Sequence, residues 1–289
     1  MRESTVDALQ EQVWIDEAAQ PLTHAVRGAF DALGPAGQRV KNALHGTWIG
    51  HPLHPILTDI LIGAWSTAVV LDAAEGFTGD ASYGRAAEVA IGFGLAGAVG
   101  SAITGLTDWS ETDGTAKRLG LVHGVLNLTA TALCATSLAI RRGGDRATGR
   151  AVGFAGLMLA GVASYFGGAL VYRDRIGVNH ADDVEVDEQF PALPADHLPE
   201  GSKQAVDVNG QKVMVARQHG RVCALAEHCS HLGGPLSEGT LKDGSIVCPW
   251  HGSEFALEDG DVINGPATHP QPYFDASEED GAIVIRKPT

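Results

Sequence analysis

The stretch VAIGFGLAGAV, residues 89–99, contains no charged and no polar side chain. A long helix on the surface of a water-soluble protein carries a polar stripe along one face, whereas this stretch is apolar on every face. It lies inside a longer apolar run, residues 86–106, whose length is close to the ~20 residues that cross a bilayer. The stretch therefore predicts a transmembrane helix.

Three further apolar runs of similar length surround this one, at residues 56–74, 119–140 and 151–172. All four runs are rich in glycine and alanine, which allow helix backbones to approach closely in lipid. A buried helical bundle in a soluble protein is the alternative, but four such runs in succession are difficult to bury in a small chain. We therefore predict a four-span membrane domain over residues 51–175, embedded in the lipid bilayer of the cell membrane.

Residues 1–50 follow a different pattern. Leu22, Val26 and Phe30 recur at every fourth position, with polar residues between them. This spacing predicts amphipathic helices that lie along the membrane surface. The N-terminus has no succession of basic, apolar and small residues, so we expect no cleaved export signal.

A linker follows the fourth apolar run. Most of residues 182–188 are acidic, and prolines follow at three nearby positions, Pro191, Pro194 and Pro199. Proline interrupts regular secondary structure, and an acidic run favours exposure to water. We therefore predict a linker over residues 176–190.

Beyond the linker, apolar residues recur in short runs such as residues 213–216 and 283–285. Glycine-containing pairs such as Asn209-Gly210 separate these runs, as expected for turns between paired strands. We predict a small all-β domain over residues 191–289. The whole chain is then an α + β multidomain protein, in which an N-terminal four-helix transmembrane bundle precedes the all-β domain.

Two short motifs in this β domain combine cysteine with histidine. Cys229-Ser-His231 is followed, after sixteen residues, by Cys248-Pro-Trp-His251. Two thiolates and two imidazoles can hold a tetrahedral zinc ion, or a [2Fe–2S] cluster in which two histidines replace two cysteines on one iron. Zinc fingers commonly place both cysteines on one knuckle, whereas here each motif supplies one cysteine and one histidine. The spacing favours the cluster and leaves a zinc ribbon as the alternative.

The residues around these ligands resemble the two cluster-binding loops of Rieske proteins, in the stretches HLGG (231–234) and CPWHGS (248–253). The stretch NGPA, residues 264–267, resembles the proline-containing loop that covers the cluster in that family. The resemblance extends over about residues 188–289. It implies a [2Fe–2S] cofactor and a domain that transfers electrons one at a time.

The resemblance also implies a role for each ligand. Cys229 and Cys248 would bind the buried iron, while His231 and His251 would bind the outer iron and form the electron exit. Three further residues are expected around the cluster, namely Ser253, Leu232 and Pro266.

Three residues depart from the high-potential members of the family. Gly234 and Trp250 stand where those proteins have a pair of disulfide-bonded cysteines, and Phe255 stands where they have a tyrosine. Hydrogen bonds to the cluster and its sulfur ligands raise the reduction potential, so the loss of the hydroxyl lowers it. We predict a potential toward the low end of the Rieske range of about −150 to +300 mV.

Polar residues also gather at the ends of the predicted spans, where they are costly enough to invite a functional interpretation. His51 and His54 open the first span with Asp59 one turn further, while His123 and Asn127 lie one turn apart in the third. Because successive spans alternate in direction, the start of the first and the start of the third lie on the same side. The β domain follows the fourth span on that side as well.

The four-span layout and the stretch GHPLHP, residues 50–55, resemble an uncharacterised bacterial membrane-domain family, which supplies no established activity. Imidazoles near a membrane surface could bind a haem b or a quinone, or could cap helices and meet lipid headgroups. Of the candidates, His123 is the better ligand because Asn127 lies on the same helical face. Other histidines have no partner spacing and are expected at the surface: His24, His45, His197, His219, His228 and His269.

Charge limits the partners. Residues 185–289 hold 7 basic and 17 acidic side chains, which is −10 of the total net charge of −15. This acidity argues against nucleic acid as a partner. It could steer a basic redox partner or simply maintain solubility. Basic residues beside the spans are nearly balanced between the two sides, and the absence of an export signal and of a disulfide favours a cytoplasmic β domain.

We predict a membrane-anchored one-electron carrier rather than a stand-alone enzyme, because we expect no second iron-binding domain of the kind that oxygenases carry. The first alternative is an oxidoreductase of quinol or quinone, with haem or quinone in the membrane domain. The second is a redox or iron sensor. A redox protein or a quinone is the expected partner, and an oligomer is possible.

Overall fold

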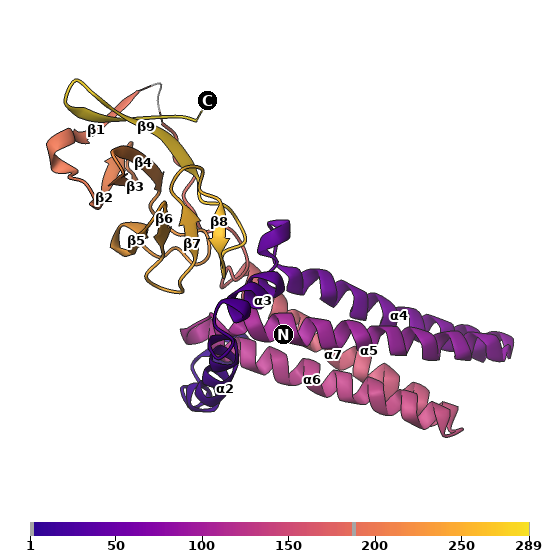
Figure 1. The fold of residues 1–289 in the computed structure, drawn as a ribbon. Coiled ribbons are helices and arrows are strands. Elements are labelled where there is room, and N and C mark those ends of the chain that lie inside the picture. The colour runs from indigo at the N-terminus through magenta and orange to yellow at the C-terminus, as the bar shows by residue number, and fades with distance from the viewer. Residues whose placement is uncertain (1–2, 187–188, 289) are drawn as a thin grey trace. The chain divides into compact units, whose positions relative to one another are not determined.

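The computed structural model describes residues 3–186 and 189–288, so residues 187 and 188 of the predicted linker lie outside the described residues. Three helices come first, followed by four long ones and then by strands (Figure 1). The first three are α1 (Glu3–Gln10), α2 (Trp14–Asp31) and α3 (Pro35–His45), and the four long helices are α4 (Leu53–Thr78), α5 (Ala81–Ser110), α6 (Gly114–Arg142) and α7 (Arg146–Tyr172).

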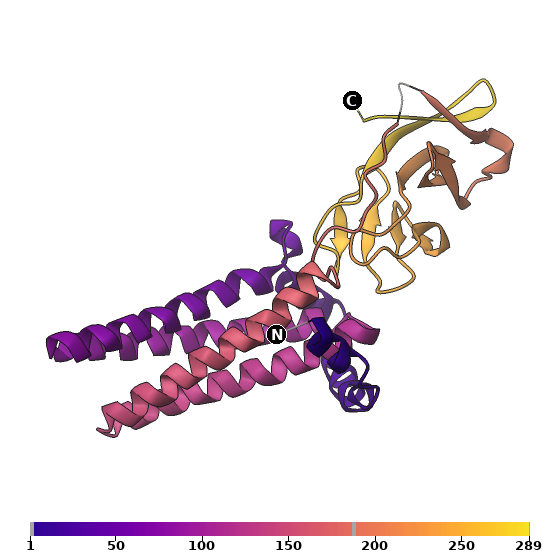
Figure 2. The same ribbon diagram turned by 180° about the vertical axis from the view of Figure 1, so that it is seen from behind.

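The four long helices are long and apolar enough to cross a membrane, as predicted. They run side by side in both views, with α4 packed chiefly on α5 and α6 chiefly on α7 (Figures 1 and 2). The four helices therefore form two antiparallel hairpins. Asp80 caps the start of α5 and Asp145 caps the start of α7, and each carboxylate accepts a hydrogen bond from a backbone N–H of the first turn, that of Ser82 or Thr148.

Glycines allow the helices within each hairpin to approach closely. A Cβ atom at Gly94 of α5 would lie 2.3 Å from Nε1 of Trp65 on α4. The matching contact in the second hairpin is between Gly156 of α7 and Cys134 of α6, whose Sγ would lie 2.8 Å from such a Cβ. Small residues at these positions are what close packing in lipid requires.

A buried ion pair joins the two hairpins. Arg141 of α6 donates to both carboxylate oxygens of Asp72 on α4, at 2.6 and 2.5 Å, and its side chain is almost completely buried. Arg150 adds a hydrogen bond to Glu75, one turn along α4. Paired charges of this kind are tolerated at membrane depth because each neutralises the other.

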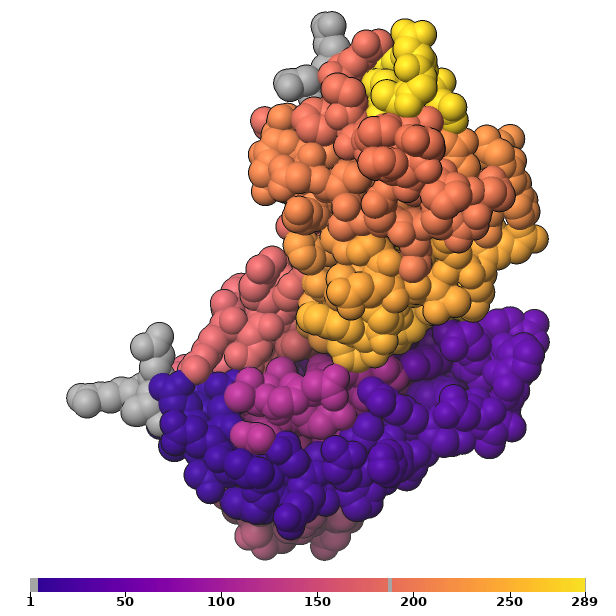
Figure 3. Space-filling model, turned by 90° about the vertical axis from the view of Figure 1, so that its left-hand side faces the viewer, coloured from indigo at the N-terminus to yellow at the C-terminus, as the bar shows by residue number. Residues whose placement is uncertain are grey.

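Helix α2 packs on α5 and α6 (Figure 3). It buries Ile15, Ala19 and Thr23, while Trp14 remains exposed. Arg118 of α6 donates to both carboxylate oxygens of Asp16, at 2.9 and 2.6 Å. The face of α2 that packs on the bundle is therefore not the one formed by Leu22, Val26 and Phe30, because Leu22 is exposed and the other two are only half-buried.

The β domain consists of two antiparallel sheets. The six-stranded sheet has the order β1-β10-β9-β4-β3-β2, and the four-stranded sheet has the order β5-β6-β7-β8. The strands are β1 (Phe190–Pro194), β2 (Lys203–Val208), β3 (Gln211–Gln218), β4 (Arg221–Ala226), β5 (Thr240–Lys242), β6 (Ser245–Val247), β7 (Glu254–Ala256), β8 (Val262–Asn264), β9 (Tyr273–Glu279) and β10 (Ala282–Arg286). The predicted all-β domain is confirmed.

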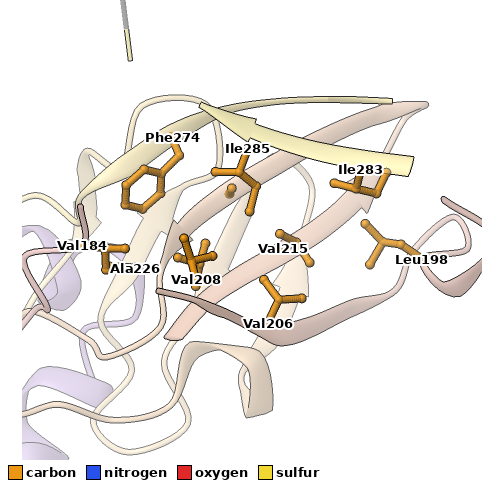
Figure 4. Packing of buried hydrophobic residues seen from close by; sticks show 11 residues of the cluster. Val184, Leu198, Val206, Val208, Val215, Ala226, Phe274, Ile283 and Ile285 are labelled. Atoms are coloured by element: carbon orange, nitrogen blue, oxygen red, sulfur yellow. The ribbon is translucent and has the colours of Figure 1, made fainter. Parts of the chain in front are cut away.

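Turns and apolar packing hold the larger sheet together. Two residues connect β2 to β3, and both Asn209 and Gly210 have positive φ, which suits the twist of a tight hairpin. Valine, isoleucine and leucine side chains from its strands pack together with Phe274 in one core (Figure 4). A second core, which includes Met214, Ile246 and Phe255, contains the two predicted cluster cysteines.

The chain divides into two compact units. The helical unit contains the residues up to Gly37 together with Pro52–Ile176, and the β unit contains Gln38–His51 together with the residues from Gly177 onward. Residues 38–51 therefore pack with the β domain, although they precede the first membrane helix in the sequence.

Candidate metal centre

The two predicted ligand loops fold in the same way. In the loop after β4, the N–H of Cys229 donates to the carbonyl of Gly234 at 2.9 Å, and Gly233 donates back to the carbonyl of Cys229 at 2.8 Å. In the loop between β6 and β7, Cys248 makes the same pair of bonds, with Ser253 at 2.8 Å and Gly252 at 3.2 Å. Gly233 and Gly252 both have positive φ, which a side chain would oppose. Each loop thus closes on its own cysteine.

These turns bring the two cysteines together in the second core, where both are buried. A hydrogen bond between the thiols, followed by burial, raises the pKa of Cys229. The same bond lowers the pKa of Cys248 to about 7, with help from the backbone N–H groups of Trp250 and His251. The thiolate is the form that binds iron. One member of the pair is therefore readily available as a ligand.

The two histidines form a second pair. The rings of His231 and His251 lie edge to face, with centroids 5.1 Å apart and planes at 85°. Burial, and then the charge of His251, lowers the pKa of His231, so its imidazole is neutral, as a metal ligand must be. Its Nδ1 atom is buried and has no hydrogen-bond partner among the described residues. A buried imidazole nitrogen is normally satisfied, so this atom marks a place for a metal ion.

Thiol is paired with thiol and imidazole with imidazole, which is the division that a Rieske cluster requires. No group of three or more His, Cys, Asp or Glu side chains surrounds a single ion position in the part of the chain that the structure describes. The pairing of like side chains fits a two-iron cluster, in which Cys229 and Cys248 would bind one iron and His231 and His251 would bind the other. When bound, such a cluster accepts and releases one electron at a time.

A third loop, after β8, covers the cysteines. Ser253 is fully buried, and its Oγ lies within hydrogen-bonding distance of Cys229 while accepting a bond from the N–H of Ala267 at 3.0 Å. Pro266 is buried in this loop, whereas Leu232 is half-buried at the tip of the first ligand loop. Of the three residues predicted around the cluster, Ser253 thus has the most direct contact with a ligand.

Of the three positions that depart from high-potential Rieske proteins, Gly234 and Phe255 are tightly packed and Trp250 is exposed. A Cβ atom at Gly234 would lie 2.8 Å from Sγ of Cys248 and 3.0 Å from two ring atoms of Trp250. The indole of Trp250 is 57% exposed beside His251. Phe255 is fully buried in the second core and has no hydroxyl to offer.

Two buried side chains that the sequence did not single out hold the loops in place. Gln271 accepts a hydrogen bond from the N–H of Ser230 at 2.9 Å and donates to the carbonyls of Ala226 and His228. Glu254 accepts bonds from Ser245, Lys242 and Asn264, at 2.7, 3.2 and 2.7 Å. No sequence motif distinguishes a structural glutamine or glutamate such as these, so only the fold reveals them.

In the helical unit, the structure brings His54, His123 and Asn127 together. The imidazoles of His54 and His123 lie edge to face with centroids 6.5 Å apart, and Asn127 Nδ2 lies 3.1 Å from Nε2 of His123. The two hairpins hold these rings alike. His54 Nδ1 is 2.9 Å from the carbonyl oxygen of Ser101 on α5, and His123 Nδ1 is 2.8 Å from that of Ala163 on α7.

A glycine four residues beyond each of these carbonyls makes room for the imidazole. A Cβ atom at Gly105 would lie 2.6 Å from Cε1 of His54, and one at Gly167 would lie 2.9 Å from Cε1 of His123. Two other predicted residues do not join this group: Asp59 is exposed, and His51 is exposed in the β unit.

The prediction that the remaining histidines lie at the surface is wrong for His45, which is only 1% exposed. It lies at the end of α3 in the β unit, where it packs on the third loop. His24, His197 and His219 are exposed as predicted, whereas His228 is half-buried and bonded to Asp182. An isolated histidine gives no sequence signal that separates these environments.

Two family models match separate parts of the chain. Residues 188–275 match the model described as Rieske [2Fe-2S] domain, and residues 50–180 match the model described as predicted membrane protein (DUF2231). The fusion of a Rieske domain to a membrane domain is thus the organisation that the sequence predicted.

Curated relatives match the β domain. The 3-phenylpropionate/cinnamic acid dioxygenase ferredoxin subunit of Escherichia coli K12 is 33% identical over 98 residues, which are 34% of this chain and 92% of that protein. The cytochrome b6-f complex iron-sulfur subunit of Chlorobaculum tepidum is 29% identical over 134 residues, 46% of this chain and 73% of that protein.

Apoptosis-inducing factor 3 of Mus musculus is 33% identical over 89 residues, 31% of this chain but only 15% of its own length. The chain therefore shares only a small part of that protein. Because the ferredoxin subunit is matched over nearly its whole length and the Rieske model matches the β domain, this chain belongs to the Rieske [2Fe–2S] family.

Proposed function

We propose that this protein is a membrane-anchored one-electron carrier with a Rieske cluster of low reduction potential. The buried Nδ1 atom of His231, which has no partner among the described residues, is the observation that carries the proposal. The ring of His231 lies beside that of His251, and each of these histidines shares a loop with one of the two buried cysteines. Four apolar helices of spanning length supply the anchor.

The chain's own residues explain why the cluster would work as a carrier. The cysteines are buried, which shields the inner iron from water, whereas His231 and His251 are only half-buried. An electron would therefore leave through the imidazoles, toward a redox partner protein or a quinone. This chemistry needs neither a substrate pocket nor a general base, so the proposal is a carrier rather than an enzyme.

The low potential rests on Phe255 and Gly234. A phenylalanine donates no hydrogen bond to a cysteine ligand, and Gly234 leaves no room for a cysteine side chain beside Cys248. A cluster that accepts fewer hydrogen bonds at its sulfur atoms and cysteine ligands is less stabilised in its reduced form, so its reduction potential is lower.

Electron paramagnetic resonance of the purified, dithionite-reduced protein tests the carrier. We expect the signal of a reduced Rieske cluster and a content of two iron atoms per chain. A redox titration of that signal measures the potential, and a midpoint above about +200 mV would contradict the low-potential proposal. A protein that binds zinc instead of iron would contradict the carrier itself.

The second candidate is an oxidoreductase of quinol or quinone, with haem b or quinone bound in the membrane helices. One observation favours it: His54 and His123 face each other, and each Nδ1 is hydrogen-bonded to a backbone carbonyl. This bond leaves Nε2 as the basic nitrogen, as in many histidines that bind metals, although Nε2 of His123 already accepts a hydrogen bond from Asn127. The visible spectrum separates the candidates, because reduced haem b gives a sharp α-band that a Rieske cluster lacks.

We further propose that the β domain lies in the cytoplasm. The loops at the two ends of the bundle allow a direct test, with new cysteines at the exposed positions Asp113, between α5 and α6, and Gly144, between α6 and α7. A membrane-impermeant thiol reagent applied to intact cells is expected to label the cysteine at Gly144. Labelling at Asp113 instead would place the β domain outside.

A further inference from the structure

Residues 38–51 belong to the β unit and bind its third loop through Asn42. The N–H of Gly265 donates to Asn42 Oδ1 at 3.0 Å, and Asn42 Nδ2 donates to Oδ1 of Asn264 at 2.9 Å. A longer bond of 3.4 Å runs from the same Nδ2 to the carbonyl of Ile263. Gln38, one turn earlier in α3, orients Asn42 with a hydrogen bond of 2.8 Å. One side chain thus bonds to three consecutive residues, the last two of β8 and the first of the third loop.

His45 packs on the same loop. Its side chain is buried, and a Cβ atom at Gly265 would lie 3.2 Å from its Cδ2 and 3.2 Å from Cγ2 of Thr47. The loop therefore has no room for a larger residue at this point. Gly46, the next residue, has a φ of 89°, a left-handed conformation that glycine adopts easily. The chain therefore turns directly after His45.

The third loop connects Asn42 with the cluster ligands. Two residues beyond Gly265, the N–H of Ala267 bonds to Ser253 Oγ, which in turn bonds to Cys229. Asn264 bonds to Glu254, the residue next to Ser253. A movement of the loop away from Asn42 would therefore disturb the hydrogen bond between Ser253 and the sulfur of Cys229.

The third loop also contacts the ligand loop that contains His231. Ser230, the residue next to His231, donates through Oγ to the carbonyl of His269 at 2.7 Å. A movement of the third loop would therefore disturb both ligand loops.

The fold does not depend on such a segment. The ferredoxin subunit of Escherichia coli is matched over 92% of its length by 98 residues, so a β domain of this family is complete without one. Here the chain instead covers the third loop with residues that lead directly into α4, which begins at Leu53. The packing therefore serves the cluster or its environment rather than the completion of a sheet.

We propose that residues 38–51 are a built-in cover of the cluster loops, in which Asn42 and His45 are positioning residues that hold the third loop closed. The cover sets the reduction potential through the hydrogen bond of Ser253 to Cys229 and, by holding the third loop closed, it restricts the access of soluble redox agents to the cluster. The inference rests on the proposed function, since it requires a bound cluster.

The test uses the full-length protein in detergent and ferricyanide as a soluble one-electron oxidant. The reduced cluster gives one electron to each ferricyanide ion, and the change in visible absorption follows the rate. Asn42→Ala removes all three bonds to the loop, so we expect oxidation to be about tenfold faster than in the wild type, together with a changed midpoint potential. His45→Ala is expected to act in the same direction.

Two exposed residues provide matched controls. Arg39→Ala alters the same helix α3 without touching the loop contacts described here, and His24→Ala removes an exposed histidine of α2. Both are expected to keep the wild-type rate. Asn42→Asp keeps the acceptor for Gly265 and removes the two hydrogen bonds that Nδ2 donates, so it replaces Asn42→Ala if that variant fails to retain iron.

The outcomes separate the cover from the carrier. Full iron content with an unchanged rate, potential and resonance spectrum in the Asn42 and His45 variants would overturn the cover and leave the carrier intact. A wild-type protein without a Rieske signal would overturn the carrier, and with it the cover. Faster oxidation with retained iron, absent from both controls, is the result that supports the inference.

Discussion

The protein contains two pairs of facing imidazoles, and they differ in what holds them. His231 and His251 lie 5.1 Å apart on two loops of the β domain, and His54 and His123 lie 6.5 Å apart on two long helices. Both pairs meet nearly at right angles. The Nδ1 atoms of the helical pair are bonded to backbone carbonyls, whereas Nδ1 of His231 has no partner among the described residues.

This difference gives a criterion for a candidate metal site, namely a buried imidazole nitrogen without a hydrogen-bond partner. A ring nitrogen that is buried without a partner destabilises the folded protein, and a metal ion that binds to it removes this destabilisation. A ring whose Nδ1 already has a hydrogen-bond partner carries no such penalty at that atom. Proximity of two histidines alone is therefore weaker evidence than an unsatisfied nitrogen.

The largest expected effect comes from removing one ring of each pair. His231→Ala or His251→Ala is expected to abolish the Rieske resonance signal, because the outer iron loses one of its two protein ligands. His54→Ala and His123→Ala are expected to retain that signal with full iron content. Iron analysis and electron paramagnetic resonance on all four variants provide the measurement, with Cys223→Ala as a control for a cysteine outside the cluster.

The comparison fails if the two pairs respond alike. Retention of the signal in His231→Ala would contradict the ligand assignment. Its loss in His54→Ala would show that the membrane pair supports the cluster.

A smaller effect is expected from adding a methyl group beside each pair. Gly234→Ala places a Cβ 2.8 Å from Sγ of Cys248, where a ligand cannot move freely, so we expect a destabilisation of about 1–3 kcal/mol and a lower iron content. Gly105→Ala places a Cβ 2.6 Å from His54 and is expected to lower the melting temperature of the helices without loss of iron. Thermal unfolding followed by circular dichroism, with iron content measured in parallel, distinguishes the two.

For these glycines, the prediction is contradicted if each variant shows the effect expected of the other. Loss of iron in Gly105→Ala with a normal Gly234→Ala would reverse the assignment of the sites. Gly28, around which a Cβ meets nothing within 4 Å, provides a glycine-to-alanine control.

The smallest effect concerns tuning rather than assembly. Phe255→Tyr adds a hydroxyl in the second core, and a new hydrogen bond to a cysteine ligand is expected to raise the midpoint potential by roughly 40–60 mV, the equivalent of about 1 kcal/mol. Phe274→Tyr, in the core of the larger sheet, is the matched control and is expected to leave the potential unchanged. An equal shift in both variants would show that the effect is not local to the cluster.

The sequence predicted the parts of this molecule whose structure is determined by residues close together in the chain. An apolar run such as residues 89–99 allows only a helix in lipid, and the spacing of Cys229-Ser-His231 already brings two ligand types onto one turn. The fold class and the family were therefore accessible from short stretches of sequence.

The parts that were missed depend on contacts between distant residues. Asn42 and Gly265 are separated by more than two hundred positions, and nothing in the pattern of α3 shows which unit it joins. For the same reason the burial of His45 was not predicted, because an isolated histidine looks the same whether it meets water or a loop. Gln271 supports the first ligand loop through ordinary amide bonds, which leave no signature in the sequence.

The matching imidazole sites of the two hairpins bear on how the membrane unit can be divided. Each hairpin contains its own histidine, its own accepting carbonyl and its own glycine, so neither borrows these parts from the other. A chain cut in the short connection at residues 111–113 would leave each fragment with a complete set. Across the cut, Asp72 and Arg141 would still attract each other, so the half-bundle is the natural piece for co-expression or for exchange between relatives.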